Sequence, residues 1–187
     1  MKKHILPALK LTVVMIILLA VIYPLAIAAV GKLTPGKGKG ETISVNGKVV
    51  GYANIGQNFT QDKYFWGRPS AIGYNASGSG GSNKGPNNPE YLKLVQDRID
   101  SFLVHNPSVK KEDIPAELVT ASGSGLDPDL SPAAVRIQVK RVAAIRHLDE
   151  ATINALVDAY VQKPLLGLFG PAKVNVLKLN VALDELH

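Results

Sequence analysis

The feature that most constrains this chain is an uncharged, almost wholly apolar segment from Leu11 to Val30. A helix of this length, at about 1.5 Å of rise per residue, covers roughly 30 Å, which matches the hydrocarbon core of a bilayer. Within it only Thr12, Tyr23 and Pro24 are not plainly apolar, and membrane helices tolerate a proline. The segment therefore predicts a transmembrane helix over residues 11–30, after a short tail of residues 1–10.

A cleaved signal peptide is the competing interpretation of the same segment. Lysines at positions 2, 3 and 10 form a basic start, and Ala26-Ile27-Ala28 resembles a small-residue cleavage site. We expect the anchor to be retained. N-terminal sequencing of protein isolated from membranes separates the alternatives, because a chain that starts near Ala29 has lost the anchor.

The composition of residues 31–187 indicates one domain and narrows its chemistry. Three of the basic residues precede residue 31, so this part carries 18 basic and 15 acidic residues, a net charge of +3. Such a small excess disfavours nucleic acid as a partner. The chain has no cysteine, which excludes disulfides, thiol catalysis and thiolate-bound zinc.

The charges that flank the apolar segment do not fix its orientation. Three lysines precede it and three follow it closely: Lys2, Lys3 and Lys10, then Lys32, Lys37 and Lys39. The positive-inside rule therefore gives no preference, and long domains are translocated largely regardless of charge. We expect a cytoplasmic N-terminus and an extracytoplasmic domain over residues 31–187, which protease accessibility in spheroplasts tests.

Helical patterns occupy the middle of this domain. Asn88 precedes Pro89 at a predicted helix start, and an apolar stripe continues to about His105. Ser131 and Pro132 begin a second helix, which is expected to reach about Leu148. A third helix begins at Asp149 or Thr152 and ends before Pro164.

Strand patterns lie on both sides of these helices. Asn46-Gly47 between short apolar runs predicts a type I′ hairpin, and Leu118 to Thr120 is a short strand candidate. From Val174 to Leu183 the alternation changes phase, which we interpret as one strand with a bulge near Leu177. The predicted fold class is α+β, with one small sheet built from both ends of the domain and about three helices packed on it.

Three stretches read as loops. Gly31 to Gly40 alternates lysine and glycine and predicts a flexible linker next to the membrane, whose lysines can contact lipid phosphates. Tyr64 to Pro89 is long and rich in Gly, Ser, Asn and Pro, but its aromatic residues predict an ordered loop. Ala121 to Pro128 is a second glycine-serine loop.

No catalytic or metal-binding pattern stands out. The glycine-rich loops match neither the P-loop nor the dinucleotide-binding motif, and no serine lies in a G-x-S-x-G sequence. His105 and His147 lie near predicted helix ends, where a cation is favoured, and two isolated histidines make a metal site improbable. Asp127 and Asp129 precede a helix start, which acidic residues suit. We expect no catalytic residue, no metal and no cofactor.

Basic residues offer two candidate interaction features. Arg136, Lys140, Arg141 and Arg146 form a face that we interpret as solvated, with an acidic partner protein or lipid as the alternative. Arg68 lies among aromatic residues and a Gly/Asn loop, where a guanidinium locks the loop or binds a partner.

Several segments resemble those of the C subunit of the bacterial Kdp potassium-transporting P-type ATPase. The matching segments are, in order, Tyr64 to Ser70, Tyr74 to Ala76, Ser79 to Pro86, Leu118 to Pro128, Ser131 to Ala134 and Val174 to Asn180. They span nearly the whole domain. Lys84 and Asp129 stand at variable positions of the family pattern, and the linker from Lys37 to Gly40 is particular to this sequence.

The resemblance implies a non-catalytic subunit of a complex in the bacterial plasma (inner) membrane. Its implied partners are a channel-like potassium-binding subunit, the P-type ATPase catalytic subunit and a small accessory peptide, besides membrane lipid. ATP and K+ would be handled by the complex. This sequence lacks the Asp-Lys-Thr-Gly phosphorylation motif, because Asp62-Lys63 is followed by Tyr64. The family is described as a chaperone that raises ATP affinity, which an extracytoplasmic domain achieves only through coupling.

We expect the two glycine-rich loops to dock on a partner. The candidates for ordering these loops or contacting a partner are Trp66, Arg68, Asn75, Ser82, Asn83, Ser122, Ser124 and Asp127. The alternative is a stand-alone anchored or secreted protein that binds a small ligand between the loops. An extracytoplasmic hydrolase is a third hypothesis, but no base accompanies a serine.

Overall fold

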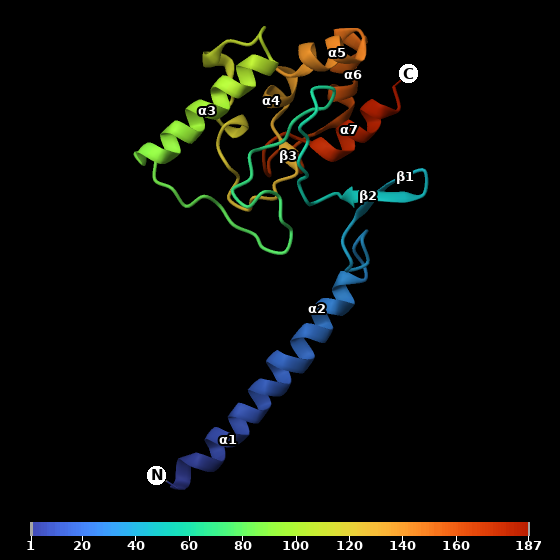
Figure 1. Ribbon diagram of the computed structural model, residues 1–187. Coiled ribbons are helices and arrows are strands. Elements are labelled where there is room, and N and C mark those ends of the chain that lie inside the picture. The colour runs from blue at the N-terminus through green and yellow to red at the C-terminus, as the bar shows by residue number, and fades with distance from the viewer. Residues whose placement is uncertain (1, 187) are drawn as a thin grey trace. The chain divides into compact units, whose positions relative to one another are not determined.

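The computed structural model describes residues 2–186, and the chain divides into two units between Thr42 and Ile43 (Figure 1). In the first unit α1 (Lys2–Ile16), a π-helical segment (Ile17–Ile22) and α2 (Tyr23–Gly31) follow one another as a continuous helix. The stretch Lys3–Gly31 is long and apolar enough to cross a membrane. The helix predicted over residues 11–30 is thus confirmed as a helix.

The π-helical segment has a local cause in Pro24. A proline has no N–H to donate to the carbonyl four residues earlier. In the turn before it, the Tyr23 N–H donates to the Leu18 carbonyl, five residues back. The wider turn accommodates the proline without breaking the helix.

Residues 32–41 form a succession of turns. The Leu33 N–H donates to the Val30 carbonyl at 2.9 Å, and Lys37 N–H to the Thr34 carbonyl at 2.8 Å. Gly38 takes φ = +78°, which glycine adopts without steric cost. The glycines at positions 36, 38 and 40 therefore favour a turn-rich connection with no regular element.

The second unit begins with the predicted hairpin. β1 (Thr42–Val45) and β2 (Lys48–Tyr52) pair around Asn46 and Gly47, whose φ values are +51° and +77°. These values confirm the type I′ turn. The hairpin is a two-stranded sheet of its own.

A separate sheet has the order β3-β5-β4 and is antiparallel. Its strands are β3 (Asp129–Leu130), β4 (Val161–Gln162) and β5 (Lys173–Asn175). Leu130 and Val161 both lie opposite Val174. The expectation that one sheet takes strands from both ends of the domain is wrong, because the hairpin does not join it. The α+β class itself is confirmed.

The predicted helices are present, with one interruption. α3 (Pro89–His105) begins where expected, and the Asn88 side chain accepts from the Tyr91 N–H at 2.9 Å. The expected helix from Pro132 to Leu148 is divided into α4 (Pro132–Arg136) and α5 (Val139–Arg146). α6 (Glu150–Tyr160) follows Asp149.

Two predicted strands are wrong. Leu118 belongs to the short 3-10 helix Ala116–Leu118, which follows another at Lys111–Asp113. The C-terminal pattern is β5 followed by α7 (Val176–Asp184), whose N-terminus is capped by Asn175. Val176, Leu179 and Leu183 are all buried at helical spacing. The pattern that we interpreted as a change of strand phase is therefore the spacing of three and four residues of a helix.

The core lies where α4 to α7 gather about the three-stranded sheet (Figure 1). Its fully buried side chains include Val135, Val142, Ile153 and Leu179. Phe65, from the long loop, is also completely buried and belongs to the same cluster. The aromatic anchoring of that loop is confirmed.

Candidate functional site

The two glycine-rich loops lie against each other. We call residues 66–88 and 121–131 the paired loops. The Ser122 N–H donates to the Pro69 carbonyl at 3.1 Å, and the Gly80 N–H to the Ser124 carbonyl at 2.9 Å. The Ser70 hydroxyl donates to the Gly125 carbonyl at 2.7 Å. Segments about fifty residues apart thus form one ordered surface, which the sequence described only as two separate loops.

Gly125 is required at the centre of this contact. It is buried with φ = +67°, a conformation that side chains disfavour. A Cβ atom there would lie 2.5 Å from the Ile72 Cγ1 atom and 2.8 Å from the Gly80 carbonyl oxygen. Only a glycine lets the loops approach this closely.

An ion pair also joins the loops. Arg68 Nη1 lies 3.1 Å from Asp127 Oδ2, and both side chains are about three-quarters buried. The Tyr74 hydroxyl donates to the Arg68 carbonyl, so the backbone of Arg68 is held as well. The ion pair supports the loop-locking interpretation of Arg68, which stays a prediction. The helix-start interpretation of Asp127 and Asp129 is incomplete, because Asp129 pairs with Lys173 at 2.6 Å.

Two buried amides hold the start of the first loop. Asn180 accepts from the Phe65 N–H and donates to the Phe65 carbonyl, both at 2.9 Å. Gln138 does the same for Trp66, at 2.9 and 3.2 Å. Each amide satisfies the backbone groups of a residue that belongs to no helix or strand. Sequence reasoning missed both residues, although Gln138 stands where the α4–α5 helix is interrupted.

Arg141 packs against the Trp66 ring, and we call Asn180, Gln138 and Arg141 together the clamp. Its guanidinium is buried, donates to Asn106 Oδ1 at 2.9 Å and to Gln138 Oε1 at 2.8 Å, and lies 4.5 Å from the Trp66 ring centroid. Burial lowers the pKa of Arg141 to about 10, and the negative charge of the Asp62 carboxylate opposes this lowering. The side chain therefore stays charged at neutral pH.

The interpretation of the α4–α5 basic residues as a solvated face is wrong for two of them. Arg141 is buried, and the Arg146 side chain is only 14% exposed. Arg146 pairs with Asp184 at 2.5 Å. The fold turns this side of α5 toward the first loop, which the sequence pattern of the helix alone does not reveal.

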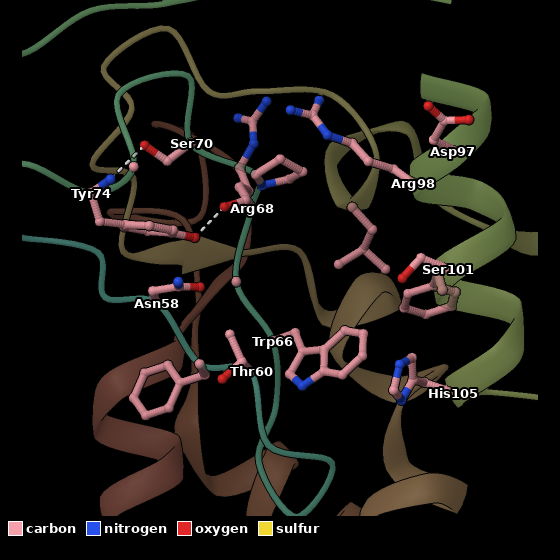
Figure 2. Close-up of a pocket in the computed structure, with 16 residues that line it drawn as sticks. Asn58, Thr60, Trp66, Arg68, Ser70, Tyr74, Asp97, Arg98, Ser101 and His105 are labelled. Atoms are coloured by element: carbon pink, nitrogen blue, oxygen red, sulfur yellow. Dashed lines mark hydrogen bonds between the residues drawn. The ribbon is translucent and has the colours of Figure 1, made fainter. Parts of the chain in front are cut away.

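Beside the clamp lies a cavity of about 510 Å³, the arginine pocket (Figure 2). Polar and aromatic lining residues are Asn58, Phe59, Thr60, Trp66, Arg68, Ser70, Tyr74, Asp97, Arg98, Ser101, Phe102 and His105. Figure 2 shows the guanidinium groups of Arg68 and Arg98 at the same end. Among residues 2–186, Arg68 Nε is buried without a hydrogen-bond partner. Burial lowers the pKa of Arg98, whose Nη1 donates to the Val119 carbonyl at 3.0 Å.

The remaining wall of this pocket contains His105. Its Nδ1 atom lies 2.8 Å from Asp62 Oδ1, and its ring meets the Trp66 ring edge-on at 4.8 Å between centroids. His105 ends α3, as expected, and His147 follows α5 with φ = +56°. In the described part of the chain, no group of three or more His, Cys, Asp and Glu residues could hold a metal ion.

The other predicted residues differ in burial. Ser122 is buried, whereas the Ser124 hydroxyl accepts from the Leu126 N–H at 3.1 Å. Asn75 is exposed, and its Oδ1 atom accepts from the Ser77 N–H at 3.0 Å. Ser82 is half-buried and Asn83 exposed, with φ = +52°. Thus Trp66, Arg68, Ser122 and Asp127 are held by contacts within the fold, whereas Asn75 and Asn83 are exposed. Their roles in ordering the loops or contacting a partner stay predictions.

Alkaline pH should weaken this site through Tyr74. Burial, with a smaller contribution from the Asp127 carboxylate, raises the pKa of Tyr74 above 10.0. Above pH 10.0 the unfolded chain therefore binds fewer protons than the folded one, and stability falls as pH rises. We expect Tyr74→Phe to show a shallower fall than the unsubstituted protein in unfolding measurements from about pH 9 to about pH 11. Tyr52→Phe, at an exposed position, is the control, and equal slopes for both variants would contradict the assignment.

Comparison with known proteins matches almost the whole chain. The family model described as KdpC, K+-transporting ATPase c chain, matches residues 5–185. The potassium-transporting ATPase KdpC subunit of Flavobacterium psychrophilum is 62% identical over 184 residues, which are 98% of this chain and 99% of that protein. The KdpC subunit of Bacteroides fragilis strain YCH46 is 53% identical over 187 residues, 98% of each chain. That of Caldanaerobacter subterraneus is 47% identical over 178 residues, 95% of this chain and 92% of the relative.

Proposed function

Because this chain belongs to the KdpC family, the c chain of K+-transporting ATPases, we propose that it is a non-catalytic subunit that stabilises the complex. In this role it promotes ATP-coupled import of K+. The observation that carries the proposal is the joining of the two glycine-rich loops into one ordered surface. The hydrogen bonds and the ion pair between the loops already order this surface. It therefore suits docking on a protein, because little conformational entropy is lost on binding.

The proposed arrangement has one transmembrane helix over residues 11–30, a cytoplasmic tail and an extracytoplasmic domain over residues 31–187. The helix packs on a channel-like potassium-binding subunit, and the paired loops dock over its ion entrance. A P-type catalytic subunit and a small accessory peptide complete the complex. The effect on ATP affinity then acts through the complex as a coupling free energy, without nucleotide contact by this chain.

The arginine pocket supports a second candidate function. A cavity of about 510 Å³ with two guanidinium groups suits a small acidic ligand, so a stand-alone binding protein would use this pocket. That function predicts a lone chain that binds a small acid without partners. The docking function predicts that large multi-span proteins accompany it.

Affinity purification separates the two functions. The full chain, tagged at its C-terminus, is purified in mild detergent from potassium-starved cells, and the accompanying proteins are identified. Co-purified multi-span subunits in constant ratio support the docking function. A monomeric chain that binds small carboxylates would contradict the docking function and support the stand-alone binding function.

Replacing Arg68 with alanine tests the surface itself. The change leaves the partly buried Asp127 carboxylate without its ion-pair partner, a loss of about 1.5–3 kcal/mol. We expect the recovery of co-purified subunits to fall on the order of tenfold. Lys84 lies on the same loop as Arg68 and forms an exposed ion pair with Glu90. Lys84→Ala removes this pair and should leave the recovery of co-purified subunits unchanged. Full recovery of the co-purified subunits and full K+ uptake after both Arg68→Ala and deletion of residues 11–30 would contradict the docking function.

A further inference from the structure

The connection between β4 and β5 exposes large apolar side chains that neither the core nor the paired loops explain. We call residues 164–170 the apolar loop. Leu165, Leu166, Leu168 and Phe169 are exposed by 69%, 81%, 81% and 63%. Scattered exposed apolar residues are normal, but four within five positions form a contiguous patch of the kind that marks an interaction site.

The apolar loop is ordered by its own backbone. The Leu165 N–H donates to the Phe169 carbonyl at 2.9 Å, and the Phe169 N–H donates back to the Leu165 carbonyl at 3.0 Å. The Gly167 N–H donates to the Pro164 carbonyl at 2.9 Å. Backbone groups satisfied within a loop can leave water at little cost, which is the condition for entering a lipid interface.

The tip of the loop has a leucine where a turn favours asparagine or glycine. Leu166 has φ = +54° and Gly167 φ = +74°, and the Leu168 N–H donates to the Leu165 carbonyl at 3.1 Å. This is a type I′ turn, in which a leucine costs about 1–2 kcal/mol. The strained position presents an apolar side chain, 81% exposed, at the outermost point of the turn.

The strand that follows the apolar loop contacts the segment by which the chain enters this unit. β5 follows the loop, and the Asn175 Nδ2 atom donates to the Ala53 carbonyl at 2.7 Å. Ala53 directly follows β2, which pairs with β1, the first strand after the linker. The linker of residues 32–41 spans at most about 35 Å. A transmembrane helix before it would therefore tether the start of this unit within that distance of the bilayer surface.

We propose that the apolar loop inserts into the interface of the bilayer that the N-terminal helix spans. Leu166 and Leu168 would enter the acyl region, and Lys163 and Lys173, at the two ends of the loop, would face lipid phosphates. Lys173 pairs with Asp129, and its side chain remains 46% exposed. The proposal rests on the membrane anchoring in the proposed function, and it is independent of the docking of the paired loops.

The absence of cysteine permits a direct test. Leu166→Cys is labelled with the polarity-sensitive dye NBD, and the full chain alone is placed in nanodiscs that contain anionic lipid. Val104→Cys is the matched control, because Val104 is 76% exposed and lies on α3, outside the apolar loop. Lipid with a nitroxide near the top of its acyl chain then serves as quencher.

We expect the dye at position 166 to lose most of its emission, and the dye at position 104 to lose little. Equal quenching at both sites, or none at position 166, would overturn the proposal. A third outcome would also overturn it: the emission of the dye at position 166 shifts to the blue only in the assembled complex and is not quenched by the lipid nitroxide. A protein pocket would then cover the loop. Because the nanodisc holds this chain alone, the result does not depend on the docking function. Circular dichroism checks that each labelled variant is folded.

Discussion

Replacing Asn180 with leucine should lower the free energy of unfolding of the Ile43–His187 unit by about 2–4 kcal/mol. Asn180 is 1% exposed and satisfies both backbone groups of Phe65, which is itself completely buried. Leucine has a similar volume but leaves this N–H and this carbonyl without partners in an apolar environment. Each unsatisfied buried group costs about 1–3 kcal/mol.

Urea unfolding of the full chain in detergent, followed by tryptophan fluorescence, measures this loss. Trp66 is the only tryptophan and directly follows Phe65, so the signal reports on the clamp. Asn87→Leu, at an exposed position, is the matched control and should change stability by less than about 0.5 kcal/mol. Equal midpoints for the Asn180 variant and the unsubstituted protein would show that Phe65 is held by packing alone.

Replacing Gly125 with alanine should separate the paired loops. The alanine Cβ would lie 2.8 Å from the Gly80 carbonyl oxygen, and backbone atoms cannot move aside as a flexible side chain can. The positive φ adds strain, so we expect a loss of about 2–4 kcal/mol in stability. Because we propose the paired loops as the docking surface, we expect co-purification of the other subunits to fall at least as much as for Arg68→Ala.

Gly123→Ala is the control for this change. Gly123 is exposed on the same loop, and a Cβ atom there would meet nothing within 4 Å. We expect its stability and its recovery of partner subunits to match those of the unsubstituted protein. A Gly125→Ala variant that assembles normally would mean that the close contact between the loops is not what the partner recognises.

Local signals in the sequence predicted the elements that local chemistry controls. The Asn46-Gly47 turn and the start of α3 at Asn88-Pro89 are confirmed, because positive φ and helix capping depend on neighbouring residues only. The α7 helix was misread as a strand, because its short apolar pattern from Val176 to Leu183 fits both periods. Its capping residue Asn175 was the signal that could have distinguished them.

Residues that act across long sequence separations were the ones missed. Gln138 and Asn180 reach Trp66 and Phe65 over 72 and 115 positions, and a single polar residue inside an apolar pattern does not reveal its partner. The same limit explains why Arg141 was assigned to a solvated face. Of the predicted site residues, Arg68 and Asp127 came from two separate matching segments, Tyr64 to Ser70 and Leu118 to Pro128, and the structure supplied the contact between them.

The sequence by itself determined the apolar helix, the α+β class and the family, because each depends on composition or on an ordered set of local motifs. The tertiary structure alone decided that two distant loops share one surface, that buried amides hold the aromatic anchors, and that four apolar side chains remain uncovered between β4 and β5. The physical reason is that hydrogen-bond satisfaction and burial belong to pairs of segments, and the pairing is made only when the chain has folded.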